Sequence, residues 1–408
     1  MSGMKREDRI PEARALMLRF ASRTGIEGDE APRRYLWTDA FAVCNALALW
    51  DATGEERFRS MALVLVDQVH GILGRHRPDD SRRGWVSGLP EDDALRHPTC
   101  GGLRIGKPLP ERAADEAFDE RLEWDRDGQY FHYLTRWMHA LDQLARRTGD
   151  AQLNVWAREL AVAAHRGFVG GPRSGRLAMV WKMSIDLSRP LVPSMGQHDP
   201  IDGLVTCLEL SATAESLPGA APEPSLERIA ADFAALAAPQ PIVTLDPLGI
   251  GGLLTDASRV VQLIEQGTLA DDGLFLCLLD GACRSLGELA RANELDRPAT
   301  RRLAFRELGL AIGLAALEPI ERLAKARLAA PAEVDSVQTR LEVLRAWRGM
   351  RDTICEFWCE PAHRRVATWI DHVDINEVML ATALVPDGWV TLTSTSVRTP
   401  DELERERG

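Results

Sequence analysis

The sequence lacks the long runs of one residue type that mark several classes of protein. It has no cluster of lysine and arginine, and its 61 acidic residues outnumber its 49 basic residues, so the net charge is −12. An acidic surface repels phosphate backbones, and we therefore expect no nucleic-acid partner. An anionic small molecule would need a local basic site. No stretch of about 18 apolar residues is present, so no membrane span is expected.

Signals for export, disulfide bonds and metals are also weak. Met1–Phe20 has no apolar core of signal-peptide length. The seven cysteines are scattered, which favours reduced thiols and a cytoplasmic protein. Cys355, Cys359 and His363 have a spacing that would place three zinc ligands on one helix face. Because Pro361 would interrupt that helix, we favour cysteine packing and expect no metal and no cofactor.

Strand-like alternation of apolar and polar residues is nearly absent, apart from one short candidate strand at Val390–Thr393. The sequence has instead a repeated pair of helical patterns. Trp37–Asp51 is apolar on nearly all faces, a turn follows at Thr53-Gly54-Glu55, and Phe58–Leu73 is apolar on one side only. The first segment is typical of a helix buried all round, and the second of a surface helix.

The same pair of patterns returns further along the chain. Tyr130–Leu144 is the buried segment, Thr148-Gly149-Asp150 is the turn, and a one-sided helix follows. In both turns the glycine is expected to end the first helix in a left-handed conformation. A third pair and several single helices are expected at Asp202–Ala214, Leu226–Leu236, Glu12–Ser22, Leu253–Glu265, Leu274–Ala292, Arg302–Leu317, Val334–Trp358 and Asp374–Val385.

These hairpins predict an all-α fold, an (α/α)₆ toroid that forms a single domain over residues 1–408. One hairpin cannot bury its inner helix alone, so neighbouring hairpins must cover it. The connections into the inner helices are long, above all residues 74–123 and 170–197. Long ordered loops are usually functional. Here they all lie on one face, where the helix N-termini carry partial positive charge.

Three groups of polar and aromatic residues precede inner helices and are expected to share that face. The first contains Tyr35, Trp37 and Asp39. The second, Glu123–Tyr133, has three carboxylates in five residues beside aromatic residues and a histidine. Capping by Asp127 would account for one carboxylate only, whereas aromatic faces stack on sugars and carboxylates bind hydroxyls or transfer protons. Its candidate residues are Glu123, Trp124, Asp125, Asp127, Tyr130 and His132. The alternative for each group is helix capping and packing.

The third group, Gln197–Gly203, enters another inner helix. Pro200 suits a first helical turn with Asp199 as the cap, and His198 can transfer protons near neutral pH. Asp202 follows one turn later. The long loops and the last inner helix add Trp85, Arg104, Lys182 and His372 as candidates.

Gly101–Lys107 has the glycine and lysine spacing of a phosphate-binding P-loop. Pro108 stands where that loop needs serine or threonine, and no strand precedes it, so we reject a nucleotide site. The glycines would still allow backbone amides and Arg104 to approach an anionic or hydroxyl-rich ligand.

The hairpin layout resembles the six-hairpin toroid families, which include the N-acylglucosamine 2-epimerases, the unsaturated glucuronyl hydrolases and several other glycosidases and polysaccharide lyases. The resemblance covers most of the chain but is architectural, and no catalytic motif matches residue by residue. The segments Trp124–Tyr133 and Gln197–Gly203 also look like a bacterial family of such proteins that has no assigned reaction. The resemblance implies sugar binding in a funnel at the inner-helix N-termini.

We therefore expect a carbohydrate-active enzyme, a glycoside hydrolase for a small sugar or a uronic-acid-containing substrate. Its acid and base would come from Asp125, Asp127 and Asp202, with Glu123 in reserve. His198 and Arg104 would bind hydroxyls or a carboxylate, and Trp37, Trp124 and Tyr130 would hold the sugar.

Three alternatives stay open. A sugar epimerase or isomerase would use His198 with His132 or His372 as bases. A toroid acting on an isoprenoid or peptide would need a less polar funnel. A non-catalytic ligand-binding toroid would use the clustered acids only as exposed helix caps. The sequence leaves the sugar, its linkage and the oligomeric state open.

Overall fold

The structure, a computed structural model, describes residues 6–170, 177–219, 221–237, 241–269, 272–327 and 331–393. Over these ranges the chain is mostly helical, as the sequence predicts, and its strands are only two or three residues long. No helix within these ranges is long and apolar enough to cross a membrane. The candidate strand at Val390–Thr393 is wrong, because a short helix covers its first residue and the next three form no strand.

The longer helices are α1 (Arg6–Arg23), α2 (Leu36–Thr53), α3 (Glu56–Leu73), α6 (Phe131–Thr148), α7 (Ala151–Phe168), α8 (Asp199–Ser216), α9 (Glu227–Leu236), α10 (Pro247–Glu265), α11 (Asp272–Ala292), α12 (Ala304–Ala315), α13 (Leu317–Arg327), α14 (Pro331–Arg345), α15 (Arg348–Cys359) and α17 (Val373–Leu384). The short elements are α4 (Glu91–Arg96), α5 (Glu120–Asp125), β1 (Gln129–Tyr130), β2 (Val169–Gly170), β3 (Ala178–Met179), β4 (Lys182–Met183), β5 (Pro190–Val192), η1 (Glu294–Asp296), η2 (Ala299–Arg301), η3 (His363–Arg365), α16 (Ala367–Ile370) and α18 (Asp387–Val390).

The first two hairpins, α2–α3 and α6–α7, follow the sequence pattern closely. α2 is buried along nearly its whole length, whereas α3 buries one face. Gly54 ends α2 with φ of 69°, and Gly149 ends α6 with φ of 74°. These left-handed conformations suit glycine because it has no Cβ, so the two predicted turns are confirmed. Asp150 caps α7 by accepting a hydrogen bond from the backbone N–H of Gln152.

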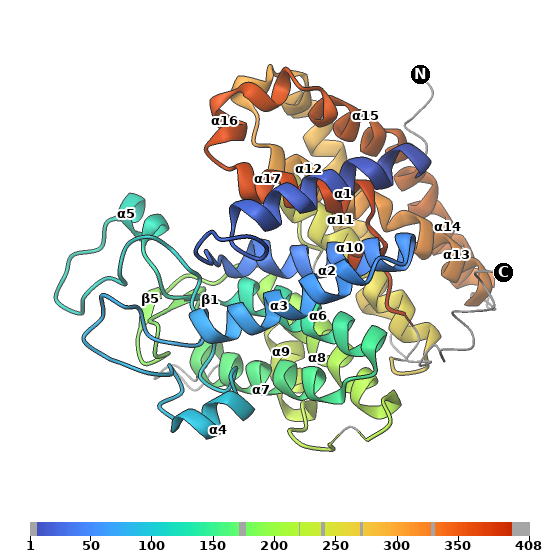
Figure 1. The fold of residues 1–408 in the computed structure, drawn as a ribbon. Coiled ribbons are helices and arrows are strands. Elements are labelled where there is room, and N and C mark those ends of the chain that lie inside the picture. Colours follow the sequence, from blue (N-terminus) through green and yellow to red (C-terminus); the bar gives the residue numbers. More distant parts are fainter. Residues whose placement is uncertain are drawn as a thin grey trace.

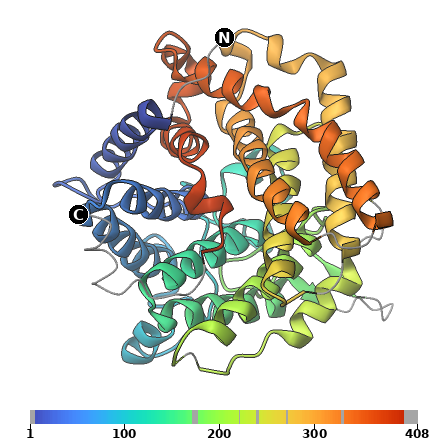
Figure 2. The ribbon, with the colours of Figure 1, turned by 90° about the vertical axis from the view of Figure 1, so that its right-hand side faces the viewer.

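Six helices, which we call the central helices, contact one another in order: α2, α6, α8, α10, α12, α17 and again α2. Four further helices, α3, α7, α9 and α11, each pack against the central helix that precedes them. α1 packs against α17, so the start of the described chain lies beside a helix near its end (Figures 1 and 2). Arg23 joins these two helices through ion pairs with Asp374 and Glu377.

One expected helix is divided in two. The segment Val334–Trp358, predicted as a single helix, forms α14 and α15, with a break at Ala346 and Trp347. α14 packs against α11 and α13, whereas α15 packs against α12 and α17. Packing on different neighbours explains the break, which the amphipathic pattern alone does not show.

The long connections meet in a small sheet on one side of the molecule. β1 pairs with β4, and β4 pairs with β5, in antiparallel order. Figure 1 shows β1, β5 and α5 together on that side. The side-chain amide of Gln129 strengthens this junction, because it bonds the backbone of Leu103, Gly101 and Ile185. The described parts of the two connections therefore contact each other and form one cap, which we call the loop cap.

Candidate functional site

A cavity of about 280 Å³ lies among the six central helices. We call it the central cavity. All six central helices contribute to its lining, and α2, α6, α8 and α10 do so through residues near their N-termini. Five of the sequence candidates meet here, namely Trp37, His132, His198, Asp199 and Asp202. Candidates from three separate segments of the sequence are thus brought together with Trp181 and Trp389.

Glycines shape the wall between α10 and α12. A Cβ on Gly251 would lie 2.0 Å from the carbonyl oxygen of Gly309, and a Cβ on Gly313 would lie 2.5 Å from Cα of Gly251. The two helices therefore touch backbone to backbone, which any side chain at these positions would prevent. Gly251 and Gly309 also line the central cavity, so this contact sets its width on one side.

His198 is held by a carboxylate that the sequence reading missed. Its Nε2 lies 2.8 Å from Oδ2 of Asp256, a buried residue of α10. Burial lowers the pKa of His198, but the hydrogen bond and negative charge of Asp256 outweigh burial, so the pKa is raised above its ordinary value. The other edge of the ring lies against Gly252, where a Cβ would come within 3.1 Å of Cε1. Asp256 therefore fixes both the charge and the orientation of the imidazole.

Asp202 is the fixed carboxylate of the central cavity. Its oxygens accept hydrogen bonds from Thr135 at 2.5 Å and from Arg136 at 2.6 Å, and Arg259 lies 3.5 Å away. Arg259 also binds Asp256 and Glu209, at 2.9 Å and 2.6 Å. A buried ionised carboxylate is stable only when it is paired and hydrogen-bonded, and these contacts supply that pairing.

Asp199 has a different environment, although it lies only three residues away. It is 6% exposed, and its Oδ2 has no hydrogen-bond partner among the described residues. Burial and the charge of Asp202 raise the pKa of Asp199 to about 6. The sequence placed Asp199 as the cap of α8. The helix instead begins at Asp199, and the capping position is His198, whose side chain forms no capping hydrogen bond. The carboxyl group is therefore available for another role.

Aromatic rings form much of the remaining wall. His132 stacks on Trp181 with ring centroids 5.8 Å apart, and Tyr130 stacks on Trp181 at 5.2 Å. Nε1–H of Trp181 donates to Nδ1 of His132 at 3.0 Å. Burial lowers the pKa of His132 to about 3, so the ring is neutral and its proton is on Nε2. His132 therefore offers a hydrogen-bond donor rather than a base.

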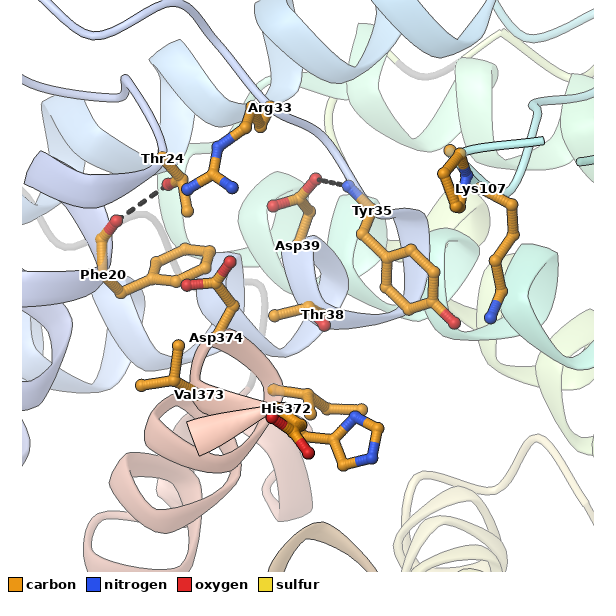
Figure 3. A pocket seen from close by; sticks show the side chains of 14 residues that line it. Phe20, Thr24, Arg33, Tyr35, Thr38, Asp39, Lys107, His372, Val373 and Asp374 are labelled. Atoms are coloured by element: carbon orange, nitrogen blue, oxygen red, sulfur yellow. Dashed lines mark hydrogen bonds between the residues drawn. The ribbon is translucent and has the colours of Figure 1, made fainter. Parts of the chain in front are cut away.

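A second cavity, of about 440 Å³, lies next to the start of α2, and we call it the Tyr35 cavity (Figure 3). It contains three further candidates, Tyr35, Asp39 and His372. Oδ2 of Asp39 accepts a hydrogen bond from the backbone N–H of Tyr35 at 2.9 Å, and Arg34 lies 3.3 Å from its other oxygen. Burial raises the pKa of Asp39 to about 6. Tyr35 occupies the capping position of α2 without a side-chain capping bond, and the carboxylate of Asp39 binds its backbone N–H instead.

The dense group around Glu123–Tyr130 is mostly part of the loop framework. Asp127 is fully buried and pairs with Arg104 at 2.5 Å, and its Oδ1 accepts hydrogen bonds from backbone N–H groups, including that of Gly106 at 3.0 Å. The predicted capping role of Asp127 is wrong, because Tyr130 occupies the capping position of α6. Asp127 and Arg104 line neither cavity, so they hold the loop rather than face a ligand.

The remaining candidates of that region are also placed away from both cavities. Glu123 pairs with Lys182 at 2.9 Å and with Arg112 at 3.0 Å, and both Glu123 and Lys182 are buried. Asp125 is exposed, and Trp124 is 48% exposed while packing edge-on against Trp181. Trp85 is buried and donates from Nε1 to Glu91.

Sequence reasoning missed the charged residues that lie inside the helices. Arg136, Asp256 and Arg259 lie within helices, whereas the pattern that predicts the site marks the residues before each helix. The available signal was a charged residue within an otherwise apolar inner segment, such as Asp256 and Arg259 three positions apart in α10. Such residues are costly to bury unless they are paired, so their presence indicates a network.

The candidate zinc ligands do not converge. His363 leaves the helix in η3 and its Nδ1 lies 2.7 Å from the carbonyl oxygen of Phe357. In the described part of the chain, no three histidine, cysteine, aspartate or glutamate side chains are grouped as they would be around a metal ion.

Comparison with known proteins places no further constraint on the site, since the chain matches no family model and no curated protein sequence.

Proposed function

We propose that the central helices and their outer partners form an (α/α)₆ toroid whose funnel is the central cavity. The circular order of contacts from α2 through α17 back to α2 supports this arrangement. The packing of α3, α7, α9 and α11 on the central helices also supports it, because each supplies the outer helix of one hairpin. α1 would complete the outer layer against α17.

We further propose that the chain is a carbohydrate-active enzyme, a glycoside hydrolase that acts in the central cavity. The observation that carries this proposal is the contrast between Asp199 and Asp202. Asp199 is buried, its Oδ2 has no hydrogen-bond partner among the described residues, and its pKa is raised to about 6. Asp202 forms an ion pair with Arg136 and accepts a hydrogen bond from Thr135. Two neighbouring carboxyl groups with opposed environments are the arrangement that glycoside hydrolysis requires.

In this scheme Asp199 is the general acid and donates its proton to the leaving oxygen. Asp202 stabilises the positive charge that develops on the sugar ring as the glycosidic bond breaks. Water then bonds to the anomeric carbon in place of the leaving group and gives a proton back to the carboxylate of Asp199. A carboxylate can accept about four hydrogen bonds, so Asp202 keeps room for a ligand beside Thr135 and Arg136. Asp202 is one of the three carboxylates that the sequence suggests for this role, whereas Asp199 takes the place of Asp125 and Asp127, neither of which lines the central cavity.

The other lining groups suit a hydroxyl-rich ring. Trp37, Trp181 and Trp389 supply flat faces on which a sugar can stack. Nε2–H of His132 and the charged ring of His198 supply donors, and Thr255 and Arg136 add polar contacts. This mixture of aromatic and paired charged groups favours a sugar over an isoprenoid, which would need an apolar funnel.

The geometry favours hydrolysis over epimerisation. Two-base epimerisation needs two side chains with free lone pairs facing one carbon atom. The lone pair of Nδ1 of His132 accepts from Trp181, and His372 lines the Tyr35 cavity instead. Of the three histidines that the epimerase alternative names, only His198 therefore has a basic ring that faces the central cavity.

The test is turnover of a panel of aryl glycosides and oligosaccharides by the wild type, Asp199→Asn and Asp115→Asn. Asp115 is an exposed loop residue, and its variant removes the same charge without touching the cavity. We expect Asp199→Asn to lose at least about 100-fold in kcat, while Asp115→Asn keeps wild-type activity. Wild-type kcat should fall as pH rises through about 6, because the acid must be protonated. Full activity of Asp199→Asn on a substrate of the wild type would refute this assignment.

A further inference from the structure

The ammonium group of Lys107 stands out because no carboxylate or carbonyl of the described residues binds it. The chain uses arginine almost everywhere and has only four lysines. Lys182, also in the loop cap, is satisfied by a carboxylate oxygen of Glu123 and by the backbone carbonyls of Glu123 and Arg126. Among the described residues, Nζ of Lys107 has neither a hydrogen bond nor an ion pair, and it lies 5.4 Å from the centre of the Tyr35 ring.

Neither of the two nearby carboxylates contacts the ammonium group of Lys107. Asp127 acts on Lys107 only through space, because its oxygens are engaged by Arg104, Arg77 and backbone N–H groups. Asp125 also acts on the ammonium through space, without contacting it. The backbone of Lys107 is fixed, since its N–H donates to Asp127 and its carbonyl accepts from Arg77. The side chain is thus presented from a rigid loop.

Lys107 faces a cavity with room for a ligand. In Figure 3 its amino group lies next to the phenol oxygen of Tyr35, and His372 lies across the opening. Two lining carboxylates have their own partners, because Asp39 pairs with Arg34 and Asp374 pairs with Arg23 at 2.6 Å. Asp371 is at the exposed rim. No lining carboxylate of the described chain therefore contacts the positive charge of Lys107.

The two cavities are neighbours on α2. Trp37 and Phe41 line the central cavity, whereas Thr38 and Asp39 line the Tyr35 cavity. Tyr133 lies between them: its phenol oxygen is 2.6 Å from that of Tyr35, and its ring packs against Trp37. Aromatic side chains therefore form the wall between the two cavities.

We propose that the Tyr35 cavity is an anion subsite in which Lys107 binds the carboxylate or phosphate group of an acidic di- or oligosaccharide. This inference rests on the proposed function, because it names the substrate class of the same enzyme. The ammonium group would form a charge-assisted hydrogen bond with the anion, with His372 across the opening. The sugar that undergoes cleavage would occupy the central cavity.

The test is calorimetric titration with sodium glucuronate, glucose 6-phosphate and glucose at low salt. The proteins are the wild type, Lys107→Met, Lys107→Arg and a control, Arg83→Met. Arg83 is exposed, donates to the carbonyl of Arg82 and lines neither cavity, so the control removes one positive charge outside both cavities. We expect the wild type to bind at least one anionic sugar more tightly than glucose. Lys107→Met should weaken that binding about 10-fold or more, the loss of one charged hydrogen bond.

The control and Lys107→Arg should stay within about threefold of the wild type, and melting temperatures should confirm that all variants are folded. Binding of glucuronate alone identifies a carboxylate, and binding of glucose 6-phosphate alone identifies a phosphate. Equal affinity of Lys107→Met and the wild type, or no preference of the wild type for either anion, would overturn the inference.

Asp199→Asn separates this inference from the proposed function. Because Asp199 lies in the other cavity, this variant should bind the anionic sugar as the wild type does. If the wild type binds the anionic sugar but hydrolyses no glycoside, the proposed reaction is contradicted and the anion subsite is still supported.

Discussion

The imidazole of His198 and the carboxylate of Asp256 form a pair between α8 and α10, across 58 positions of the sequence, with 2.8 Å between Nε2 and Oδ2. Asp256 is buried and also binds Arg259. These interactions hold the pKa of Asp256 below its usual range although burial opposes this. The pair links a ring in the central cavity to charges deep in the helical core.

Replacing Asp256 with asparagine should lower the pKa of His198. Burial, which disfavours the charged ring, would then act without the compensating carboxylate. NMR titration of the histidine ring protons measures this change. The variant should also lose roughly 3–5 kcal/mol of stability, because Arg259 loses a buried partner. Asp232→Asn, which removes the partner of His165 on another helix, should leave the titration of His198 unchanged. An unaltered pKa of His198 in Asp256→Asn would contradict the pairing.

Asp199 should make stability fall as pH rises from about 4 to about 6. Its folded-state pKa of about 6 lies above the ordinary value, so the folded state binds the proton more tightly than the unfolded state does. The resulting stabilisation, at most about 3 kcal/mol, is present at low pH and is lost as pH rises through 6. Urea unfolding of wild type and Asp199→Asn across this range isolates the effect as the difference between the two curves. A pH-independent difference would show that Asp199 titrates normally.

The backbone contact between α10 and α12 predicts an asymmetry between two glycines. Gly251→Ala would push a Cβ to 2.0 Å from the carbonyl oxygen of Gly309, so we expect a loss of about 1–3 kcal/mol or more. Gly287→Ala, in α11, meets nothing within 4 Å and should gain about 0.5–1 kcal/mol from reduced backbone freedom in the unfolded chain. Chemical denaturation of both variants checks the prediction, which fails if they are equally stable.

Asp127 and Asp125 should behave oppositely, although they are two residues apart. Asp127→Asn breaks a fully buried pair with Arg104, and we expect a loss of roughly 3–5 kcal/mol. Asp125→Asn changes an exposed side chain and should alter stability by about 0.5 kcal/mol or less. Differential scanning calorimetry of the two variants compares them directly. Similar melting temperatures would mean that Asp127 does not anchor the loop.

Much of the fold could be predicted because the spacing of apolar residues in the sequence agrees with the burial of the inner helices. α2 is apolar on every side and α3 on one side, and each pattern permits only one kind of packing. The break between α14 and α15 could not be predicted, since it follows from packing against different neighbours rather than from the local pattern.

The candidate site was predicted in part for a related reason. Helix N-termini gather at one rim, so His198, Asp199, Asp202 and Trp37 were selected from position alone. Position does not say which carboxylate already has a partner. Asp127 is paired with Arg104, 23 residues earlier in the sequence, and Lys107 has no such partner. Contacts of this kind depend on how the two long connections cross, which no local pattern encodes.

The packing of α1 on α17 has a consequence for biosynthesis. Arg23 leaves the ribosome early, whereas its ion-pair partner Asp374 follows 351 residues later. Until then the apolar side of α1, including Leu16, Met17 and Phe20, has no permanent cover from α17. Contacts this distant in sequence slow folding, so the apolar side of α1 waits for α17 to be made, and a chain that stops before α17 would leave this apolar surface open to chaperones.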